Sequence, residues 1–243
     1  MKVKAIISAL MLMACGMASA QTKTYLNVET APGVYKSFEV NKDLKISWGE
    51  KKEVPPTTGT AERTGSVNVR WVQLWENGPK FAEYNVGANS ATEYGGYFTW
   101  GGNSANGEGV WNDYYNDGES NLSGTDDTAT NLWGSNWRMP TQAELEGLLA
   151  NCEVEWTTNY NGTGKNGLLC TGKGTYSSNS VFFPAASNCI EGGVYEQGYY
   201  GYYWSSTPDG SDGAYSLYFD SYSQCVNFFG RCGGCSVRAV LAK

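Results

Sequence analysis

The sequence predicts an α+β protein with few helices, short antiparallel strands and long loops. Its 243 residues include 31 Gly, 9 Trp and 17 Tyr, a composition typical of loop-rich proteins that contain β-sheet. Only residues 142–151 carry complete helix signals, whereas short runs of β-branched and aromatic residues occur along the whole chain. These observations favour short strands joined by loops over a helical bundle.

Residues 1–20 are predicted to be a signal peptide. Lys2 and Lys4 precede an apolar stretch, and the Ala-Ser-Ala sequence at 18–20 is a typical cleavage site. The alternative is a lipoprotein signal with Cys15 as the lipid-bearing residue, which would be the protein's only membrane attachment. The apolar stretch is too short to span a bilayer. Both interpretations predict export, to the medium or to the outer surface.

Residues 21–53 are predicted to form a small β segment. Strand-like runs at 24–28 and 36–40 flank an Ala-Pro-Gly turn, which is a hairpin signal, and residues 45–48 are a candidate third strand. A Pro pair followed by small polar residues then predicts a linker over residues 54–66.

The main domain is predicted to cover residues 67–243. Residues 69–75 are rich in β formers and predict a strand, and the polar, Gly-rich residues 101–131 predict a loop. Five further strand candidates lie at residues 167–170, 181–184, 202–207, 214–219 and 237–241.

The predicted helix at residues 142–151 begins with a capping box. The Thr141 hydroxyl is expected to accept from the Glu144 amide, while the Glu144 carboxylate accepts from the Thr141 amide. Three leucines form one apolar stripe: Leu145, Leu148 and Leu149. The helix should therefore pack one face on a sheet.

The C-terminal tract, residues 195–235, has the composition of a recognition surface. Of its 41 residues, 22 are Tyr, Ser, Gly or Asn, the mixture that antibody paratopes use. Alternation along residues 214–220 predicts Tyr215, Leu217 and Phe219 in the core and the residues between them exposed. Within a predicted binding tract of 199–235, the candidate ligand-binding residues are Asp209, Asp212, Ser216, Tyr218, Asp220, Tyr222, Asn227 and Phe229.

Charge and composition exclude several functions. The net charge is −7, and removal of residues 1–20 with their two lysines leaves 15 basic and 24 acidic residues, or −9. Such a surface repels phosphate backbones, so no nucleic-acid partner is expected. The chain contains no His, which excludes catalytic triads that need one.

Six cysteines follow the predicted cleavage site, and in an exported protein disulfides are the expected state. The six are Cys152, Cys170, Cys189, Cys225, Cys232 and Cys235. Three late cysteines without His make a poor zinc site, because structural zinc takes four ligands. We expect neither a metal nor another cofactor.

Six motifs occur in one order along residues 67–243. They are NVGA at 85–88, YGGYFTWG at 94–101, WRMPTQAEL at 137–145, FPAA at 183–186, YWSS at 203–206 and SVR at 236–238. This order resembles the major paralogous domain of secreted Bacteroidetes and Fibrobacter proteins. The resemblance implies a C-type lectin-like fold of the formylglycine-generating-enzyme type, preceded by a small N-terminal β segment.

The tail also resembles the variable proteins of diversity-generating retroelements, which mutate template adenines. The resemblance implies that Cys225, Cys232, Gly233 and Cys235 are products of such diversification of Tyr and Asn codons. The alternative is a fixed loop set in an ordinary paralogue, and the sequence leaves both open.

Enzymatic activity is not expected. The cysteines do not match the catalytic pair of the formylglycine-generating enzymes, and the tract around them lacks the positive charge that activates a thiol. Trp111-Asn112-Asp113 matches a lectin calcium triplet, but it precedes the helix and has no partner triplet. The acidic residues Asp113, Asp117, Asp126 and Asp127 are at most a weak calcium signal.

These patterns predict a secreted or cell-surface receptor or adhesin that binds a protein or glycan on another cell, a phage or a host. The alternatives are a structural component of a fimbria or envelope, docked through its N-terminal β segment, and a divergent enzyme of the formylglycine-generating type.

Overall fold

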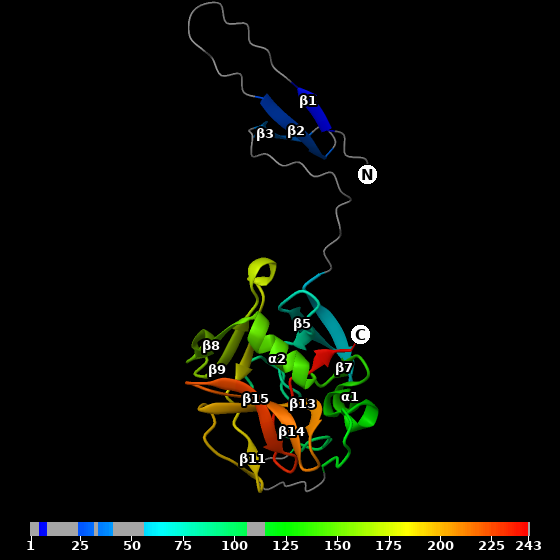
Figure 1. Cartoon of the computed structure of the whole chain (residues 1–243), viewed down its shortest axis with the longest axis vertical. Coiled ribbons are helices and arrows are strands. Elements are labelled where there is room, and N and C mark those ends of the chain that lie inside the picture. Colours follow the sequence, from blue (N-terminus) through cyan, green and yellow to red (C-terminus); the bar gives the residue numbers. More distant parts are fainter. Residues whose placement is uncertain (1–4, 9–23, 32–33, 41–55, 106–114, 243) are drawn as a thin grey trace, which may run out of the picture. The chain divides into compact units, whose positions relative to one another are not determined.

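The computed structural model describes residues 5–8, 24–31, 34–40, 56–105 and 115–242. The chain forms two compact units, Met1–Val54 and Pro55–Lys243 (Figure 1). Each unit is described by itself below.

Unit 1 contains a three-stranded antiparallel sheet in the order β1-β2-β3. Its strands are Ala5–Ser8 (β1), Thr24–Ala31 (β2) and Val34–Val40 (β3). Leu26 pairs with Phe38, so the predicted hairpin is confirmed, with longer strands than expected. β1 lies inside the predicted signal peptide, and its removal would leave the β2–β3 pair. The candidate strand at 45–48 lies outside the described residues.

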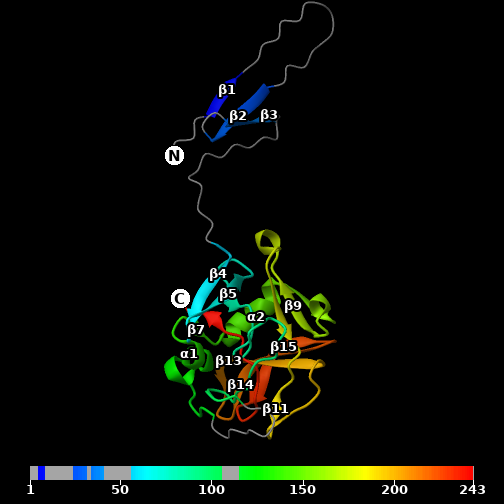
Figure 2. The same cartoon turned by 180° about the vertical axis from the view of Figure 1, so that it is seen from behind.

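The first sheet of unit 2 has five strands in the order β4-β5-β6-β16-β7. The strands are Thr58–Arg63 (β4), Val67–Gln73 (β5), Lys80–Ala82 (β6), Val240–Leu241 (β16) and Trp137–Arg138 (β7). β16 joins β6 to β7, so the last strand of the chain completes the sheet that the first strand of the unit begins (Figure 2).

The predicted linker at 54–66 is too long. Thr58–Arg63 forms β4, an edge strand paired with β5 over its whole length. Gly59 allows this close approach, since a Cβ there would lie 2.5 Å from the Trp71 ring. The predicted strand at 69–75 corresponds to β5, and the predicted strand at 237–241 is reduced to β16.

The described residues contain two α-helices, α1 (Thr128–Trp133) and α2 (Gln142–Asn151). α2 has the predicted bounds and both capping-box hydrogen bonds. α1 corrects the prediction of a loop over residues 101–131. Asp127 caps it by accepting from the Thr130 amide, and the buried Trp133 anchors it. Three short 3-10 turns lie at Gly124–Asp126, Tyr160–Gly162 and Gly174–Tyr176.

Three smaller sheets complete unit 2. One has the order β10-β9-β8, with strands Ser180–Pro184, Gly167–Thr171 and Glu153–Thr157. Another pairs β11 (Cys189–Ile190) with β12 (Gly193–Val194). The third, here called the C-terminal sheet, has the order β13-β14-β15 and strands Tyr200–Asp209, Gly213–Asp220 and Gln224–Gly230. Four strands of these sheets were not predicted: β8, β11, β12 and β15.

The C-terminal sheet lies between two hydrophobic clusters. Trp204 and Ala214 belong to the cluster that contains Trp100 and Trp137. Leu217 and Phe219 belong to the second cluster, which contains Leu145 and Leu148 of α2. The structure is thus mainly antiparallel sheet with few helices, in agreement with the predicted α+β class, and both faces of its last sheet contribute to the core.

Candidate functional site

The C-terminal sheet is built from two hairpins. A turn at residues 210–212 joins β13 to β14, and residues 221–223 join β14 to β15. The register places Tyr202, Tyr218 and Cys225 in one row across the three strands, and Trp204, Ser216 and Asn227 in another. Because side chains alternate along a strand, all of these share one face.

We call the part of this face that carries half-buried rings the aromatic face. It consists of Tyr200, Tyr202, Tyr218 and Phe229, with Asp220, Cys225 and Asn227 beside them. Tyr202 is central: its ring centroid lies 4.7 Å from that of Phe229, 5.0 Å from Tyr218 and 5.8 Å from Tyr200. All four rings are partly exposed. They pack against one another and remain partly accessible to solvent.

Asp220 orders the open end of this face. One carboxylate oxygen accepts from the Tyr218 hydroxyl at 2.6 Å, and the other accepts from the backbone amides of Tyr222 and Ser223 at 2.7 and 2.8 Å. The hydrogen bond from Tyr218, followed by that from the Tyr222 amide, lowers the pKa of Asp220. The same bond raises the pKa of Tyr218. Asp220 therefore fixes the turn that holds the Tyr222 side chain in solvent, 95% exposed.

Seven of the eight predicted ligand-binding residues divide into two groups, and the eighth, Ser216, is buried. Tyr218, Asp220, Asn227 and Phe229 lie together on the aromatic face, with Tyr222 at its end. Asp209 and Asp212 lie by the β13–β14 turn, at the other end of β14. An eight-residue strand spans about 23 Å at a rise of about 3.3 Å, so these acids do not share a site with Tyr222.

Two assignments from the alternation are wrong. Ser216 was predicted to be exposed, but it is 1% exposed because Trp204 and Ala214 on the same face belong to a core cluster that covers this end. Tyr215 was predicted to be core, but it is only partly buried. Its hydroxyl lies near Asp209, whose negative charge raises the pKa of Tyr215. Leu217 and Phe219 are fully buried, as predicted.

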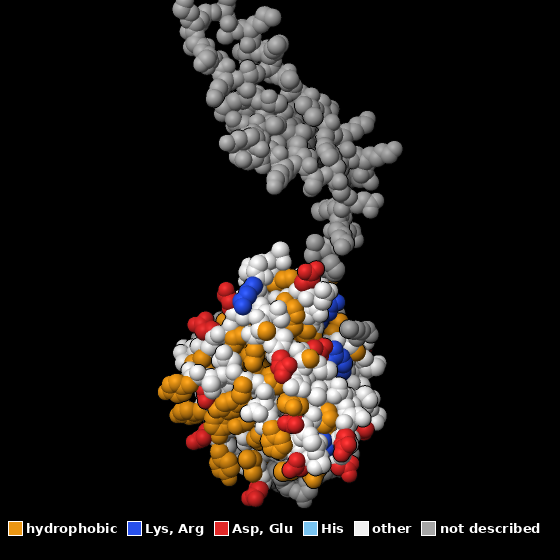
Figure 3. All heavy atoms as spheres, in the orientation of Figure 1, with side chains coloured by type: hydrophobic (Ala, Val, Ile, Leu, Met, Phe, Trp, Pro, Cys, Tyr) orange, Lys and Arg blue, Asp and Glu red, His pale blue; other side chains and the backbone are white. Residues whose placement is uncertain are grey.

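Tyr200 and Tyr202 were missed as site residues. They alternate with the buried Tyr203 along β13, and the same parity count applied to residues 200–204 would have found them. Figure 3 shows hydrophobic side chains gathered on the lower left of unit 2, with no Lys or Arg among them. The most exposed large tyrosines are Tyr195, Tyr199 and Tyr222, all from the C-terminal tract.

Two buried arginines fix the backbone segments around the aromatic face. Arg231 follows β15 and donates to the carbonyl oxygens of Gly210, Gly213 and Asn116, while its guanidinium lies 4.3 Å from the Trp100 ring. Arg231 thus fixes the β13–β14 turn.

Arg238 of the SVR motif is equally buried. It donates to the side-chain oxygen of Asn85 and to the carbonyl of Phe182. Burial lowers its pKa to about 10. Its hydrogen bonds link segments far apart in the sequence, which is a structural role.

All six cysteines in the described part of the chain are free thiols in this structure, whereas disulfides were expected. Their cross-strand partners are other residues: Cys170 pairs with Val154, Cys189 with Gly234 and Cys225 with Tyr218. Burial raises the pKa of Cys152 to about 11 and also raises that of Cys170 and Cys235. The buried thiols are therefore poor nucleophiles.

The acidic loop residues do not assemble a metal site in the part of the chain that is described. Asp127 is buried and accepts from the amides of Thr130 and Met139, which makes it a structural cap. Asp117 and Asp126 line a polar hollow of about 350 Å³. Asp113 and the Trp111-Asn112-Asp113 triplet lie outside the described residues.

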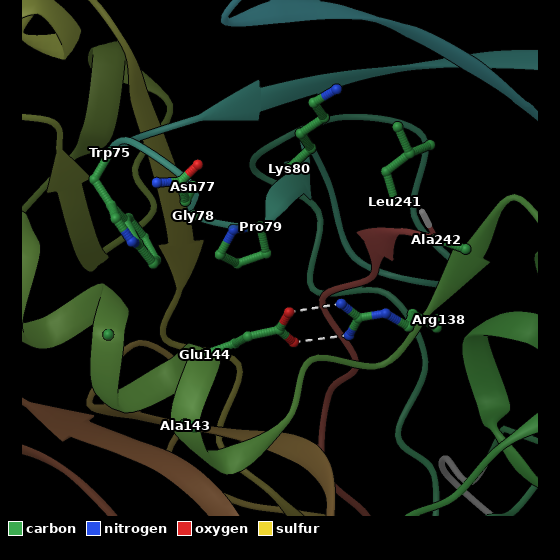
Figure 4. Close-up of a pocket in the computed structure, with 11 residues that line it drawn as sticks. Trp75, Asn77, Gly78, Pro79, Lys80, Arg138, Ala143, Glu144, Leu241 and Ala242 are labelled. Carbon is green, nitrogen blue, oxygen red and sulfur yellow. Dashed lines mark hydrogen bonds and ion pairs between the residues drawn. The ribbon is translucent and has the colours of Figure 1, made fainter.

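A second hollow, of about 400 Å³, lies beside α2 (Figure 4). Trp75 and Lys80 line it, together with the ion pair of Arg138 and Glu144. Both oxygens of Glu144 accept from Arg138, at 2.6 and 2.7 Å, so the charges neutralise each other. Arg138 and Glu144 therefore form a structural ion pair at this hollow.

Comparison of the chain with protein-family models, with curated proteins and with solved structures found no match. Among the described residues, no helix is long and apolar enough to cross a bilayer.

Proposed function

We propose that the protein is an exported ligand-binding protein, of the receptor or adhesin type, whose recognition surface is the aromatic face together with Tyr222. The observation that carries this proposal is the cluster of four half-exposed rings on a sheet whose other face is core. Clustered tyrosines give contact area at little conformational cost, because their side chains have only two rotatable angles.

The fixed turns at both ends of the C-terminal sheet also support a role in ligand binding. Asp220 holds the Tyr222 turn through backbone hydrogen bonds, and Arg231 holds the opposite turn. A preorganised surface loses less entropy on binding than a flexible one. We propose binding rather than catalysis, since the chain has no His and the buried thiols have raised pKa values.

We further propose a C-type lectin-like fold for unit 2 and membership of the major paralogous domain family. Two features support this proposal: the first and last strands of the unit share one sheet, and three long C-terminal strands form a second one. The motif residues are structural, as that assignment requires. Trp204 donates to the Phe98 carbonyl at 2.7 Å, and Tyr203 donates to the Pro184 carbonyl at 2.6 Å.

We also propose that a retroelement diversifies the tail, but only at positions whose side chains are exposed. Cys225 and Cys232 are exposed and can vary without disturbing the core. Cys235 and Gly233 are buried, and a Cβ on Gly233 would lie 2.3 Å from the Phe229 ring. Sequencing of the coding region in a population tests the idea. Adenine-specific variation at the exposed codons supports it, and a uniform sequence refutes it.

The ligand-binding proposal is tested by screening the full chain against a glycan array and a displayed random-peptide library. The variants Tyr218→Ala and Tyr222→Ala should lose binders that the wild type retains. Tyr176→Ala is the control, because Tyr176 lies on a 3-10 turn outside the C-terminal sheet. Equal binding by all four proteins would refute the proposal.

A structural or assembly role is the second candidate, because unit 1 forms a separate small sheet. Deletion of residues 21–55 should abolish incorporation into a surface assembly if that role holds. It should leave ligand binding intact if unit 2 is the receptor.

A further inference from the structure

The two edges of the C-terminal sheet differ in their hydrogen bonding. The outer edge of β13 is covered by other parts of the chain. The Tyr202 carbonyl accepts from the Ser236 amide at 3.0 Å, the Tyr200 carbonyl accepts from the Ser187 amide at 2.7 Å, and the Ser206 amide donates to Pro140 at 2.7 Å. This edge is closed to further pairing.

The outer edge of β15 is open. The Asp220 amide donates to Ser223 and the Arg231 amide donates to Asp212, each at 2.9 Å, which fixes the phase of the antiparallel ladder. Odd-numbered residues of β15 therefore bond to β14. The even-numbered residues direct their backbone groups outward: Gln224, Val226, Phe228 and Gly230.

Only two of these outward groups have a partner within the described chain. The Phe228 amide donates to the side-chain oxygen of Asn227 at 2.8 Å, and the Gly230 carbonyl accepts from the Gly233 amide at 3.0 Å. Among the described residues, the amides of Gln224, Val226 and Gly230 have no backbone partner, nor do the carbonyls of Gln224, Val226 and Phe228.

This edge also lacks the usual protection. Proteins commonly protect edge strands with charged side chains, prolines or short length. β15 has seven residues, none of them charged and none Pro, and Gln224, Asn227 and Phe228 are exposed. A long, uncharged, open edge is a template for a further strand.

We propose that β15 binds an extended polypeptide segment of a protein ligand by strand addition, with an uncharged centre and basic residues at its ends. The inference rests on the proposed function, because it names the ligand class of the surface to which β15 belongs. Outward backbone groups supply affinity. On the face that carries Phe228, the exposed side chain of Gln224 is available to contact the added strand, while the Phe228 ring lies over Gly213 of β14.

Charge favours such a segment over a second copy of this chain as the partner of β15. Asp220 lies at the Gln224 end of β15 and Asp212 at the Gly230 end. Residues 174–230 contain no Lys or Arg, and Arg231, which follows β15, is fully buried with its guanidinium bound to backbone carbonyls. Antiparallel pairing of two β15 strands would bring together two copies of the same acidic chain, each with a net charge of −7. A strand with basic ends meets opposite charges instead.

The test is a titration of the full, isotope-labelled chain with the synthetic peptide KKTVTVTVKK, followed by amide NMR. The Gln224, Val226 and Gly230 amide resonances should shift. Methylation of alternate peptide amides, on the side that faces β15, should weaken binding by about tenfold or more, as should exchange of the Lys ends for Glu. The charge effect should shrink in high salt.

Proline variants test the protein side of the pairing. Gln224→Pro and Val226→Pro remove outward amides that β14 does not use, a placement that edge strands tolerate. Each should weaken peptide binding by about tenfold, whereas the controls Gln224→Ala and Val226→Thr should not. If Val226→Pro fails to fold, the exposed Gln224 position still carries the test.

Three results would overturn the inference. They are unchanged binding by the proline variants and the methylated peptide, unshifted β15 amides, or dimerisation through β15 in place of peptide binding. If ligand binding then still depended on Tyr218 and Tyr222, the proposed function would stand and only strand addition would fail.

Discussion

The two ends of one sheet face differ in what covers them. At the closed end, Trp204 and Ser216 lie in adjacent strands and are 0% and 1% exposed. At the open end, Tyr202 and Tyr218 pair in the same way and are half-buried, and Tyr222 is 95% exposed. Both pairs lie in one continuous register, which shifts only beyond Trp204. The difference comes from tertiary packing, so the closed end anchors the sheet and the open end is free to recognise a ligand.

The largest expected loss of stability comes from a substitution at the closed end. Trp204→Ala removes a fully buried ring and its hydrogen bond to Phe98, which should lower the free energy of unfolding by about 3–5 kcal/mol. Denaturant unfolding followed by fluorescence measures this change. A loss no larger than that of Tyr222→Ala would contradict the closed-end assignment.

The next largest difference in stability is expected between Ser substitutions of a buried and an exposed cysteine. Cys235→Ser places a hydroxyl in a fully buried apolar setting and should cost about 1–3 kcal/mol. Cys225→Ser, on the exposed part of the aromatic face, should change stability by less than about 0.5 kcal/mol. Thermal unfolding of the two variants, measured side by side, makes the comparison, and equal losses would count against it.

The variant Tyr218→Phe tests the role of Asp220, because it removes the 2.6 Å hydrogen bond from the Tyr218 hydroxyl to the Asp220 carboxylate and keeps the ring. The variant should lose about 0.5–1.5 kcal/mol at neutral pH. The folded-state pKa of Asp220 is lowered, so this contribution is present above its unfolded pKa of about 4 and is lost as the pH falls through the folded value. The stability gap between wild type and variant should therefore narrow in acid. A gap that does not depend on pH would show that the bond does not act through the carboxylate.

The smallest expected effect on stability is that of Tyr222→Ala. Its side chain contacts almost nothing in the structure, so the free energy of unfolding should stay within about 0.5 kcal/mol of wild type. Ligand binding should nevertheless fall in the array and peptide screens. Unfolding caused by this change would mean that the turn is part of the frame.

Local signals in the sequence predicted several elements well. The capping box specified α2 to the residue, and the alternation in β14 placed Leu217 and Phe219 in the core. These features depend on neighbours within one element. They are therefore visible without knowledge of the tertiary structure.

The predictions that were wrong concern features that depend on residues distant in the sequence. Ser216 is buried because Trp204 and Ala214 lie with it in a cluster built from several segments, which no count within β14 can show. β15 was missed because its Asn, Gln and Gly residues are poor strand formers, and pairing with β14 overrides that preference. α1 was missed because it has only six residues and depends on Asp127 and on burial of Trp133.

The most direct test of the recognition surface is a substitution scan of residues 199–235, scored separately for protease resistance and for binding to ligands recovered in the screens. Changes at Tyr222 and Asn227 should reduce binding while resistance is retained. Changes at Tyr218 and Asp220 should reduce binding with only a small loss of resistance, because their shared hydrogen bond contributes to stability. Changes at Trp204 and Ser216 should reduce both. If the tract proved neutral for binding, and Trp75 and Lys80 beside α2 controlled it instead, the account would be contradicted.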